Sequence, residues 1–179
     1  MEKVLVYSHS LLEKYLIKDS VTIDATCGWG NDTLFLAPLS KKVYAFDVLE
    51  EAIEKTKELC KDFNNIEYIL DGHQNVLNYV KEEVGGAIFN LGYLPKGSKE
   101  KTTLVSTTSK AVSDILKILQ KDGIIVIVFY PGHPEGKRES VEVLEYLKKL
   151  DQHEFDVMKY EFINQINDPP FLVGIMRKV

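Results

Sequence analysis

Short apolar runs alternate with amphipathic stretches along most of the chain. Apolar runs of four to eight residues are typical of buried strands, and apolar residues that recur every three to four positions are typical of helices. The pattern predicts strands at residues 21–25, 42–48, 66–70, 86–91, 123–130, 155–163 and 171–178. It predicts helices at residues 8–17, 32–39, 50–63, 75–83, 102–120 and 139–150. Gly123 is expected to close the helix at 102–120, as a glycine often does after a helix C-terminus.

The predicted strands and helices alternate until the last two strands, which have no helix between them. Alternation of this kind indicates a parallel sheet with helices on both faces. The last two strands are expected to pair antiparallel, because parallel neighbours need a crossover of a dozen or more residues. Residues 1–179 are therefore predicted to form one α/β domain with a Rossmann-like, seven-stranded, mostly parallel sheet and one antiparallel strand. This is the arrangement of class I methyltransferases.

Composition narrows the class of protein. The chain has 179 residues, of which 45% are hydrophobic, which is enough for one core. Its net charge of −5 argues against a strongly basic nucleic-acid binder, although a local basic patch remains open. The two cysteines form no CxxC pair, so we expect neither a disulfide nor a metal framework, and a cytoplasmic location. We expect no signal peptide and no membrane span, since no apolar run reaches 18 residues.

The segment DATCGWGNDT follows the first predicted strand and carries the clearest chemistry. Gly28 and Gly30 allow backbone to come close to a ligand, and the following helix start offers free N–H groups. Asp24 ends the strand, and Asp32 lies in the first turn of the helix, where its charge would repel a phosphate. The segment therefore favours a ligand that is cationic or carries hydroxyls and amines, and S-adenosylmethionine (SAM) is the leading candidate. NAD is less favoured, because Thr33 occupies the third glycine position of GxGxxG.

In open parallel sheets, ligands bind beyond the carboxyl ends of the strands, so residues at those ends are expected to converge. Asp47 ends the second strand and is predicted to accept both hydroxyls of a ribose. Asp71 is predicted to accept from the adenine amino group, and His73 to stack on that ring or bond near it. Asp24 and Asp32 would meet the ammonium or sulfonium region, with capping of the turn and helix as an equally good role. The other predicted cofactor contacts are Thr26, Trp29, Asn31, Val48, Gly72 and Asn90.

The fourth strand ends in Asn90-Leu91-Gly92-Tyr93. Nucleic-acid aminomethyltransferases often place NPPY here. The Asn oxygen then orients the target nitrogen, and the aromatic ring stacks on the base. Asn90 and Tyr93 keep that spacing without the paired prolines. Asp32 and His133 are candidate acceptors for the amine proton, an ordinary loop histidine being the alternative for His133. A basic rim for phosphates is predicted from Lys96, Lys99, Lys101, Lys137 and Arg138, with a solvated surface as the alternative.

Taken in order, DATCGWGNDTLFLA, VYAFDV, DGH, AIFNLGYLPKG, GIIVIVFYPGHPEG and NQINDPPFLVGIMRK resemble the bacterial tRNA 5-aminomethyl-2-thiouridine methyltransferases, small enzymes once labelled rRNA methylases. The resemblance covers essentially the whole chain. It implies SAM as cofactor and contacts to it at Gly28, Trp29, Asn31, Asp32, Asp47 and Gly72–His73. Two positions depart from the family's pattern, since Trp29 stands where the family has Asn and Leu49 where it has Gln.

The resemblance further implies that the substrate is the anticodon region of tRNA, where the aminomethyl group of the wobble uridine is converted to methylaminomethyl. Two alternatives stay open at this point. One is a methyltransferase of rRNA or a small molecule, and the other is a SAM-binding module that recognises RNA without chemistry. A homodimer that pools the basic loops is a further open alternative, because an acidic monomer would bind tRNA weakly.

Overall fold

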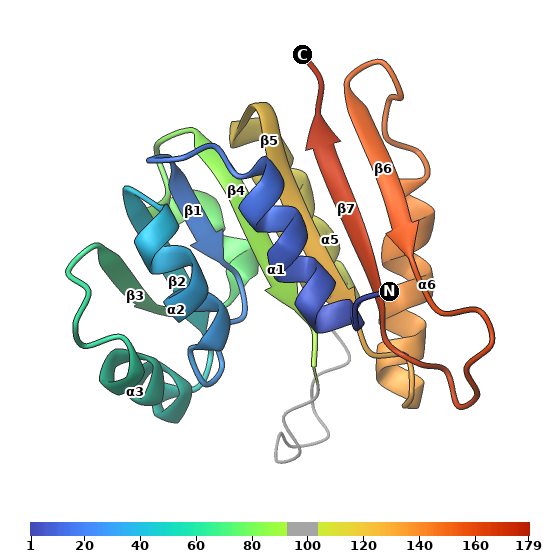
Figure 1. The fold of residues 1–179 in the computed structure, drawn as a ribbon, viewed down its shortest axis with the longest axis horizontal. Coiled ribbons are helices and arrows are strands. Elements are labelled where there is room, and N and C mark those ends of the chain that lie inside the picture. The colour runs from blue at the N-terminus through green and yellow to red at the C-terminus, as the bar shows by residue number, and fades with distance from the viewer. Residues whose placement is uncertain (93–103) are drawn as a thin grey trace.

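The computed structural model describes residues 1–92 and 104–179 of the chain. Within these residues, seven strands form one sheet in the order β3-β2-β1-β4-β5-β7-β6 (Figure 1). The strands are β1 (Val21–Asp24), β2 (Lys42–Asp47), β3 (Ile66–Leu70), β4 (Val84–Asn90), β5 (Leu119–Phe129), β6 (Phe155–Tyr160) and β7 (Phe171–Arg177). The helices are α1 (Val4–Tyr15), α2 (Asn31–Leu36), α3 (Glu50–Leu59), α4 (Val76–Tyr79), α5 (Leu104–Ile118) and α6 (Pro134–Leu147). Single 3₁₀ turns lie at Ala37–Leu39 and His73–Asn75.

The direction of the strands confirms the predicted fold class. β3, β2, β1, β4 and β5 pair parallel, whereas β7 is antiparallel to both β5 and β6. β7 is therefore the one reversed strand, as the missing helix before it predicts. The chain runs outward from β1 to β3 and then returns to β4 on the other side of β1. This reversal between β1 and β4 is the point at which open α/β sheets bind ligands.

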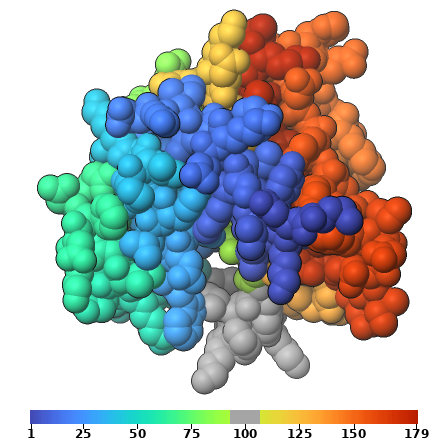
Figure 2. Space-filling view, in the orientation of Figure 1, coloured from blue at the N-terminus to red at the C-terminus, as the bar shows by residue number. Residues whose placement is uncertain are grey.

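The sheet is covered by helices on both faces, and residues 124–129 of β5 show why that part of the strand is continuously apolar. Ile125 and Ile127 belong to the core cluster that includes residues of α5 and α6. Val126 and Val128 belong to the cluster that includes residues of α1 and α2. Successive side chains of a strand point to opposite faces, so a strand buried on both sides has no polar positions. Figure 1 shows α1, α2 and α3 on one face and α5 and α6 on the other, and in Figure 2 α1 lies across the near face.

Several predicted boundaries differ from the structure: the first helix begins at Val4, α3 and α4 end four residues early, and β6 ends at Tyr160. Two further boundaries are wrong for reasons of local chemistry. α5 ends at Ile118 and β5 begins at once, at Leu119, so Gly123 lies inside the strand. The residue there with positive φ is Asp122 (63°), because aspartate also tolerates the left-handed region. α6 begins at Pro134, five residues before the predicted start. Proline suits the first position of a helix, where its missing N–H costs nothing.

Among the helices of residues 1–92 and 104–179, none is long and apolar enough to cross a membrane.

Candidate functional site

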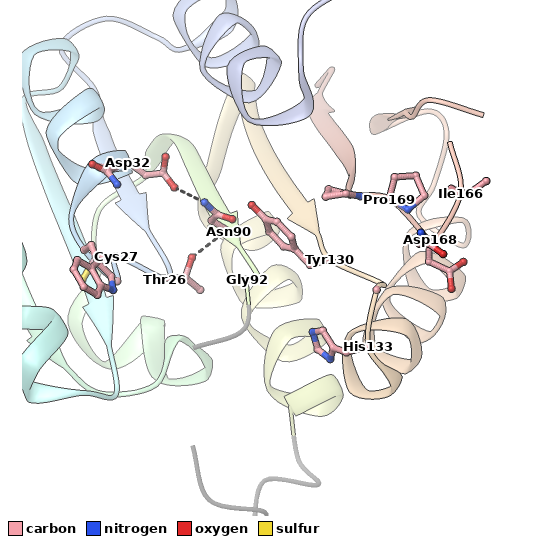
Figure 3. Close-up of a pocket in the computed structure, with 16 residues that line it drawn as sticks. Thr26, Cys27, Asp32, Asn90, Gly92, Tyr130, His133, Ile166, Asp168 and Pro169 are labelled. Atoms are coloured by element: carbon pink, nitrogen blue, oxygen red, sulfur yellow. Dashed lines mark hydrogen bonds between the residues drawn. The ribbon is translucent and has the colours of Figure 1, made fainter. Parts of the chain in front are cut away.

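A cleft of about 840 Å³ opens where β1, β4 and β5 end (Figure 3). Its size is within the range of small-molecule sites. One side, the glycine-turn wall, consists of Thr26, Cys27, Gly28, Trp29, Asn31 and Asp32. The other side, the β5–β7 wall, consists of Tyr130, Gly132, His133 and residues 166–170. The lining is completed by Asn90, the last residue of β4, and by Gly92.

The two glycines of the turn have different reasons to be there. Gly28 (φ 51°) and Gly30 (φ 87°) both adopt the left-handed conformation that favours glycine. A Cβ on Gly30 would lie 3.0 Å from the Cα of Thr56, so Gly30 also allows α3 to pack against the turn. A Cβ on Gly28 would meet nothing closer than 3.9 Å, and Gly28 lines the cleft, whereas Gly30 is not among the lining residues. Close approach of backbone to a ligand is therefore supported at Gly28.

Asp24 is sealed beneath the turn. It is 0% exposed, and its carboxylate oxygens accept from the backbone N–H of Thr26 (3.2 Å) and the hydroxyl of Thr33 (2.6 Å). Burial, reinforced by the negative charge of Asp32, raises the pKa of Asp24 to about 8. Of the two roles predicted for Asp24, the geometry supports ordering of the turn. Contact with a ligand stays a prediction.

Asp32 lines the cleft and connects three elements. It is 8% exposed at the start of α2. One carboxylate oxygen lies 2.6 Å from Nε2 of His9 in α1, and the other accepts from Nδ2 of Asn90 at 3.2 Å. The carboxylate is thus held between two nitrogens rather than capping its own helix. Figure 3 shows the bond to Asn90.

Asn90 lies at the centre of the cleft. Its backbone N–H donates to the hydroxyl of Thr26 (2.8 Å), which fixes the end of β4 against the glycine turn. Its side-chain nitrogen points to Asp32, and Tyr130 lies beside its amide (Figure 3). Burial and the charge of Asp32 raise the pKa of Tyr130, and a hydrogen bond with Asn90 opposes this shift. The Tyr130 hydroxyl is therefore protonated at neutral pH. Tyr93, predicted to act with Asn90, lies outside the described residues.

Asp47 is held by the backbone on both oxygens. One accepts from the N–H of Gly28 (3.0 Å), the other from the N–H of Leu49 (2.9 Å). It is half-buried at the end of β2, and neither it nor the exposed Val48 lines the cleft itself. A carboxylate has about four acceptor sites, so Asp47 keeps capacity for the hydroxyls of a ligand lying against Gly28. Its predicted contact with a ribose therefore fits the geometry and stays a prediction.

The loop after β3 is a further part of the predicted site that the structure does not bring into the cleft. Asp71 accepts from its own neighbours, namely the N–H of Gly72 (2.7 Å), Nδ2 of Asn75 (2.9 Å) and the hydroxyl of Tyr79 (2.9 Å). The Asn75 bond is the main cause that lowers the pKa of Asp71. Nδ1 of His73 lies 3.0 Å from the carbonyl oxygen of Ala25, and burial lowers the pKa of His73. Asp71, Gly72 and His73 do not line the cleft, so their contacts with adenine stay predictions.

His133 lines the cleft, but its side chain has a structural role at the start of α6. It is the N-cap of α6, and its Nδ1 accepts from the backbone N–H of Gly136 at 3.1 Å. A neutral imidazole has one acceptor nitrogen, so Nε2 carries the proton here. Protonation of Nδ1 would break the cap. This arrangement favours Asp32 over His133 as the proton acceptor.

The remaining predicted residues lie at the rim. Trp29 is 61% exposed, with Nζ of Lys55 3.7 Å from the centre of its ring, and Asn31 is exposed at the start of α2. In the predicted basic rim, Lys137 pairs with Asp168 (3.0 Å) and Arg138 with Glu142 (2.8 Å). These pairings reduce the positive charge available for phosphates. The three lysines of the other predicted loop, Lys96, Lys99 and Lys101, lie outside the described residues.

Sequence reasoning missed several residues of this site. His9 was not singled out, because one histidine in an N-terminal helix carries no signal of what it faces. Its spacing of three residues from the buried Leu12 is the one hint that it points inward. Residues 166–170 were read as a connection between strands. Asn167 (65°) and Asp168 (47°) have positive φ and are followed by two prolines, so this segment is a conformationally restricted turn.

Comparison with known proteins agrees with this geometry. The family model described as "Putative rRNA methylase" matches residues 43–176. The chloroplastic tRNA (mnm(5)s(2)U34)-methyltransferase of Arabidopsis thaliana is 34% identical over 92% of this chain. The chain spans 66% of the length of that relative, and 18% and 26% of the next curated relatives it matches, which are RNA methyltransferases.

Two solved structures are similar over their whole length. A Streptococcus mutans protein described as a methyltransferase, in complex with S-adenosylhomocysteine (SAH), has 47% sequence identity and a TM-score of 0.91, with 99% of each chain covered. An rRNA-methylase structure from Clostridium thermocellum has 40% identity and a TM-score of 0.92, with 99% of this chain and 98% of that chain covered. The expectation of a SAM-type cofactor agrees with the first of these structures.

Proposed function

The chain belongs to the family described as "Putative rRNA methylase", and from that premise we propose that it is a SAM-dependent RNA methyltransferase that methylates the aminomethyl group of the wobble uridine in tRNA. The observation that carries the choice of tRNA is the 34% identity, over 92% of the chain, to a tRNA (mnm(5)s(2)U34)-methyltransferase. The geometry of Asn90 supports an amine as the target.

The glycine-turn wall fits SAM. Gly28 lines the cleft, and a Cβ on it would meet nothing closer than 3.9 Å. Its backbone N–H donates to Asp47, whose carboxylate keeps acceptor capacity for a ribose. Asp32 supplies a carboxylate where a dinucleotide would need to place phosphate, which favours a cationic ligand. Gly28, Trp29, Asn31, Asp32 and Asp47 are the residues that would hold the cofactor.

When bound, SAM supplies a methyl carbon that passes to the amine nitrogen while its sulfur keeps the electron pair. The chain's own task is to orient the amine and accept its proton. Asp32 binds the nitrogen of the Asn90 amide, and the Asn90 oxygen, which has two lone pairs, keeps capacity beside Tyr130 to accept a hydrogen bond from the target amine. The amine attacks in its neutral form, and Asp32 is proposed to accept the proton that the ammonium form loses first.

The β5–β7 wall is proposed to receive the uridine base. Tyr130 offers a neutral aromatic side chain next to Asn90. Pro169 and Pro170 lie on the same wall. Paired prolines, which the sequence lacks after Asn90, are thus contributed to the cleft by the connection between β6 and β7. Their fixed φ angles make this part of the wall rigid.

The family description favours one second candidate, methylation of rRNA. One experiment separates the two. Nucleosides from tRNA and rRNA of a strain lacking the gene are analysed by mass spectrometry. Loss of methylaminomethyl uridine with build-up of its aminomethyl precursor supports the proposal. If tRNA is unchanged and a methylated nucleoside disappears from rRNA, the tRNA assignment is wrong.

Complementation sharpens this test. The wild-type gene is expected to restore the tRNA nucleoside and the Asn90→Ala variant to restore little of it. Asn64→Ala, which changes an exposed asparagine away from the cleft, is the matched control and is expected to restore it fully. Whether the protein forms a homodimer is tested separately, by its molar mass in solution with and without tRNA.

A further inference from the structure

We propose that His9 is a positioning residue of this site, which fixes Asp32 and through it the orientation of the Asn90 amide. The inference deepens the proposed function, on which its activity readout rests. It concerns a residue of α1, an element that lies before β1 and contributes nothing to the cleft lining.

The geometry of His9 is restrained on two sides. Its Nε2 lies 2.6 Å from Oδ1 of Asp32, a distance typical of strong, charge-assisted hydrogen bonds. Its ring stacks on Phe35 of α2, with centroids 4.0 Å apart and planes only 8° from parallel. The stack sets the plane of the imidazole, and the hydrogen bond sets its rotation. α1 and α2 are thereby joined at the edge of the cleft.

The chemistry of the bond decides which atom carries the proton. An ionised carboxylate only accepts, so Nε2 of His9 must be the donor to Oδ1. Oδ2 is then free of His9 and accepts from Nδ2 of Asn90 at 3.2 Å. An Asn amide can bind with either end, and Asp32 admits only the nitrogen end. His9 therefore acts through Asp32: by fixing that carboxylate, it leaves the oxygen end of the Asn90 amide facing a target amine.

The buried charge explains why a donor is needed at this place. Asp24 is fully buried, and its pKa is raised partly by the charge of Asp32. Two carboxyls this close cannot both be ionised without compensation. A donor at Oδ1 of Asp32 offsets part of the repulsion between the two carboxyl groups. Without His9, Asp32 would lose the bond that fixes the rotation of its carboxylate, and Oδ2 would no longer be held beside Nδ2 of Asn90.

Two substitutions separate the hydrogen bond from the stacking. His9→Phe keeps an aromatic ring on Phe35 and removes the donor. His9→Gln keeps an N–H donor near the position of Nε2 and removes the ring. Ser10→Ala, which removes only an exposed hydroxyl bonded to the carbonyl of Val6, is the control on the same helix. Thermal melting of each variant shows whether the fold is retained.

The first measurement is single-turnover methylation of tRNA that carries the aminomethyl nucleoside, with the KM for SAM determined in parallel. His9→Phe is expected to slow methyl transfer at least about tenfold with a KM for SAM within about threefold of wild type. His9→Gln is expected to keep a third or more of the wild-type rate, and Ser10→Ala all of it. If His9→Phe is as fast as wild type, or if His9→Gln is as slow as His9→Phe, the positioning role is refuted.

The second measurement needs no substrate and so separates this inference from the proposed function. In ¹⁵N-labelled protein, the side-chain amide signal of Asn90 is identified by its loss in Asn90→Ala. It is expected to shift in His9→Phe and to stay near its wild-type position in His9→Gln and Ser10→Ala. An unmoved signal in His9→Phe overturns the inference. If wild-type protein fails to methylate tRNA while the signal shifts as expected, the proposed substrate is wrong and the positioning stands.

Discussion

The two walls of the cleft are built in different ways. In the glycine-turn wall and the strand ends beside it, carboxylates are held by backbone N–H groups a few residues away, as Asp24 is by Thr26 and Asp47 by Leu49. In the β5–β7 wall, the contacts join distant segments, such as Lys137 to Asp168, 31 residues apart. The backbone of the first wall is ordered largely by local bonds, with Asp32 the exception because it is held by His9 and Asn90, whereas the second wall depends on how α6 and the last strands pack.

This difference suggests a division of labour. A locally ordered turn offers the same backbone donors whatever surrounds it, which suits a cofactor of constant structure. A wall assembled from separate elements can change with any of them, which suits the recognition of a particular substrate. Asn90 lies where the two meet, since its backbone is bound to Thr26 and its side chain reaches both Asp32 and Tyr130.

The largest expected effect is therefore at Asn90. Asn90→Ala removes the group that orients the amine and leaves the glycine turn intact. We expect the rate of methyl transfer to fall roughly 100-fold, because misplacement of a reacting group costs about that factor. SAM affinity, measured by calorimetry, should stay within about twofold, and Asn64→Ala should change neither value. If Asn90→Ala transfers the methyl group at the wild-type rate, Asn90 has no part in catalysis.

Asp47→Ala tests the glycine-turn wall alone. The substitution leaves the N–H groups of Gly28 and Leu49 without their acceptor and removes the predicted partner of the ribose. We expect SAM binding to weaken by about 1–3 kcal/mol, the usual cost of unpaired polar groups. Calorimetry of Asp47→Ala beside Asp62→Ala, an exposed aspartate beyond α3, provides the measurement. Equal affinities in the two variants would remove Asp47 from the site.

The same division explains what could be predicted from the sequence. The alternation of apolar runs and amphipathic stretches predicted the parallel sheet. The absence of a helix between the last two strands predicted that one strand is reversed. The glycine turn was also predictable, because Gly28, Asp24 and Asp32 are close in sequence. The bond between His9 and Asp32 was not, since it spans 23 residues and depends on how α1 crosses the sheet. The role of His133 as a helix cap was hidden by the wrong predicted start of α6.

A smaller effect is expected in the dependence of stability on pH. Burial raises the pKa of Asp24 to about 8, whereas an aspartate in the unfolded chain titrates near about 4. Between these values the folded state keeps a proton that the unfolded state releases. The free energy of unfolding should therefore fall as the pH rises from about 4 to about 8, by at most about 1.4 kcal/mol per pH unit from this group.

Asp24→Asn checks this contribution, because an amide resembles the protonated acid and does not ionise. Urea unfolding of wild type and variant is followed across that pH range, with Asp62→Asn as the control. The difference in unfolding free energy between wild type and Asp24→Asn should change steadily with pH, and that for Asp62→Asn should stay level. A constant difference for Asp24→Asn would mean that Asp24 is ionised throughout and that the turn holds a buried charge.

The smallest effect is expected at Trp29, the residue of the glycine-turn wall least fixed by local bonds. Its ring is 61% exposed and its recorded partner is Lys55, a cation–π contact that contributes about 0.5–1 kcal/mol at exposed sites. If the ring also covers the cofactor, Trp29→Ala should weaken SAM binding about two- to fivefold by calorimetry, and Trp29→Phe should restore most of it. Unchanged SAM affinity in Trp29→Ala would show that the Trp29 ring does not contact the cofactor. The glycine-turn wall would then bind through its backbone and carboxylates alone, and the exposed tryptophan would be available to the substrate side.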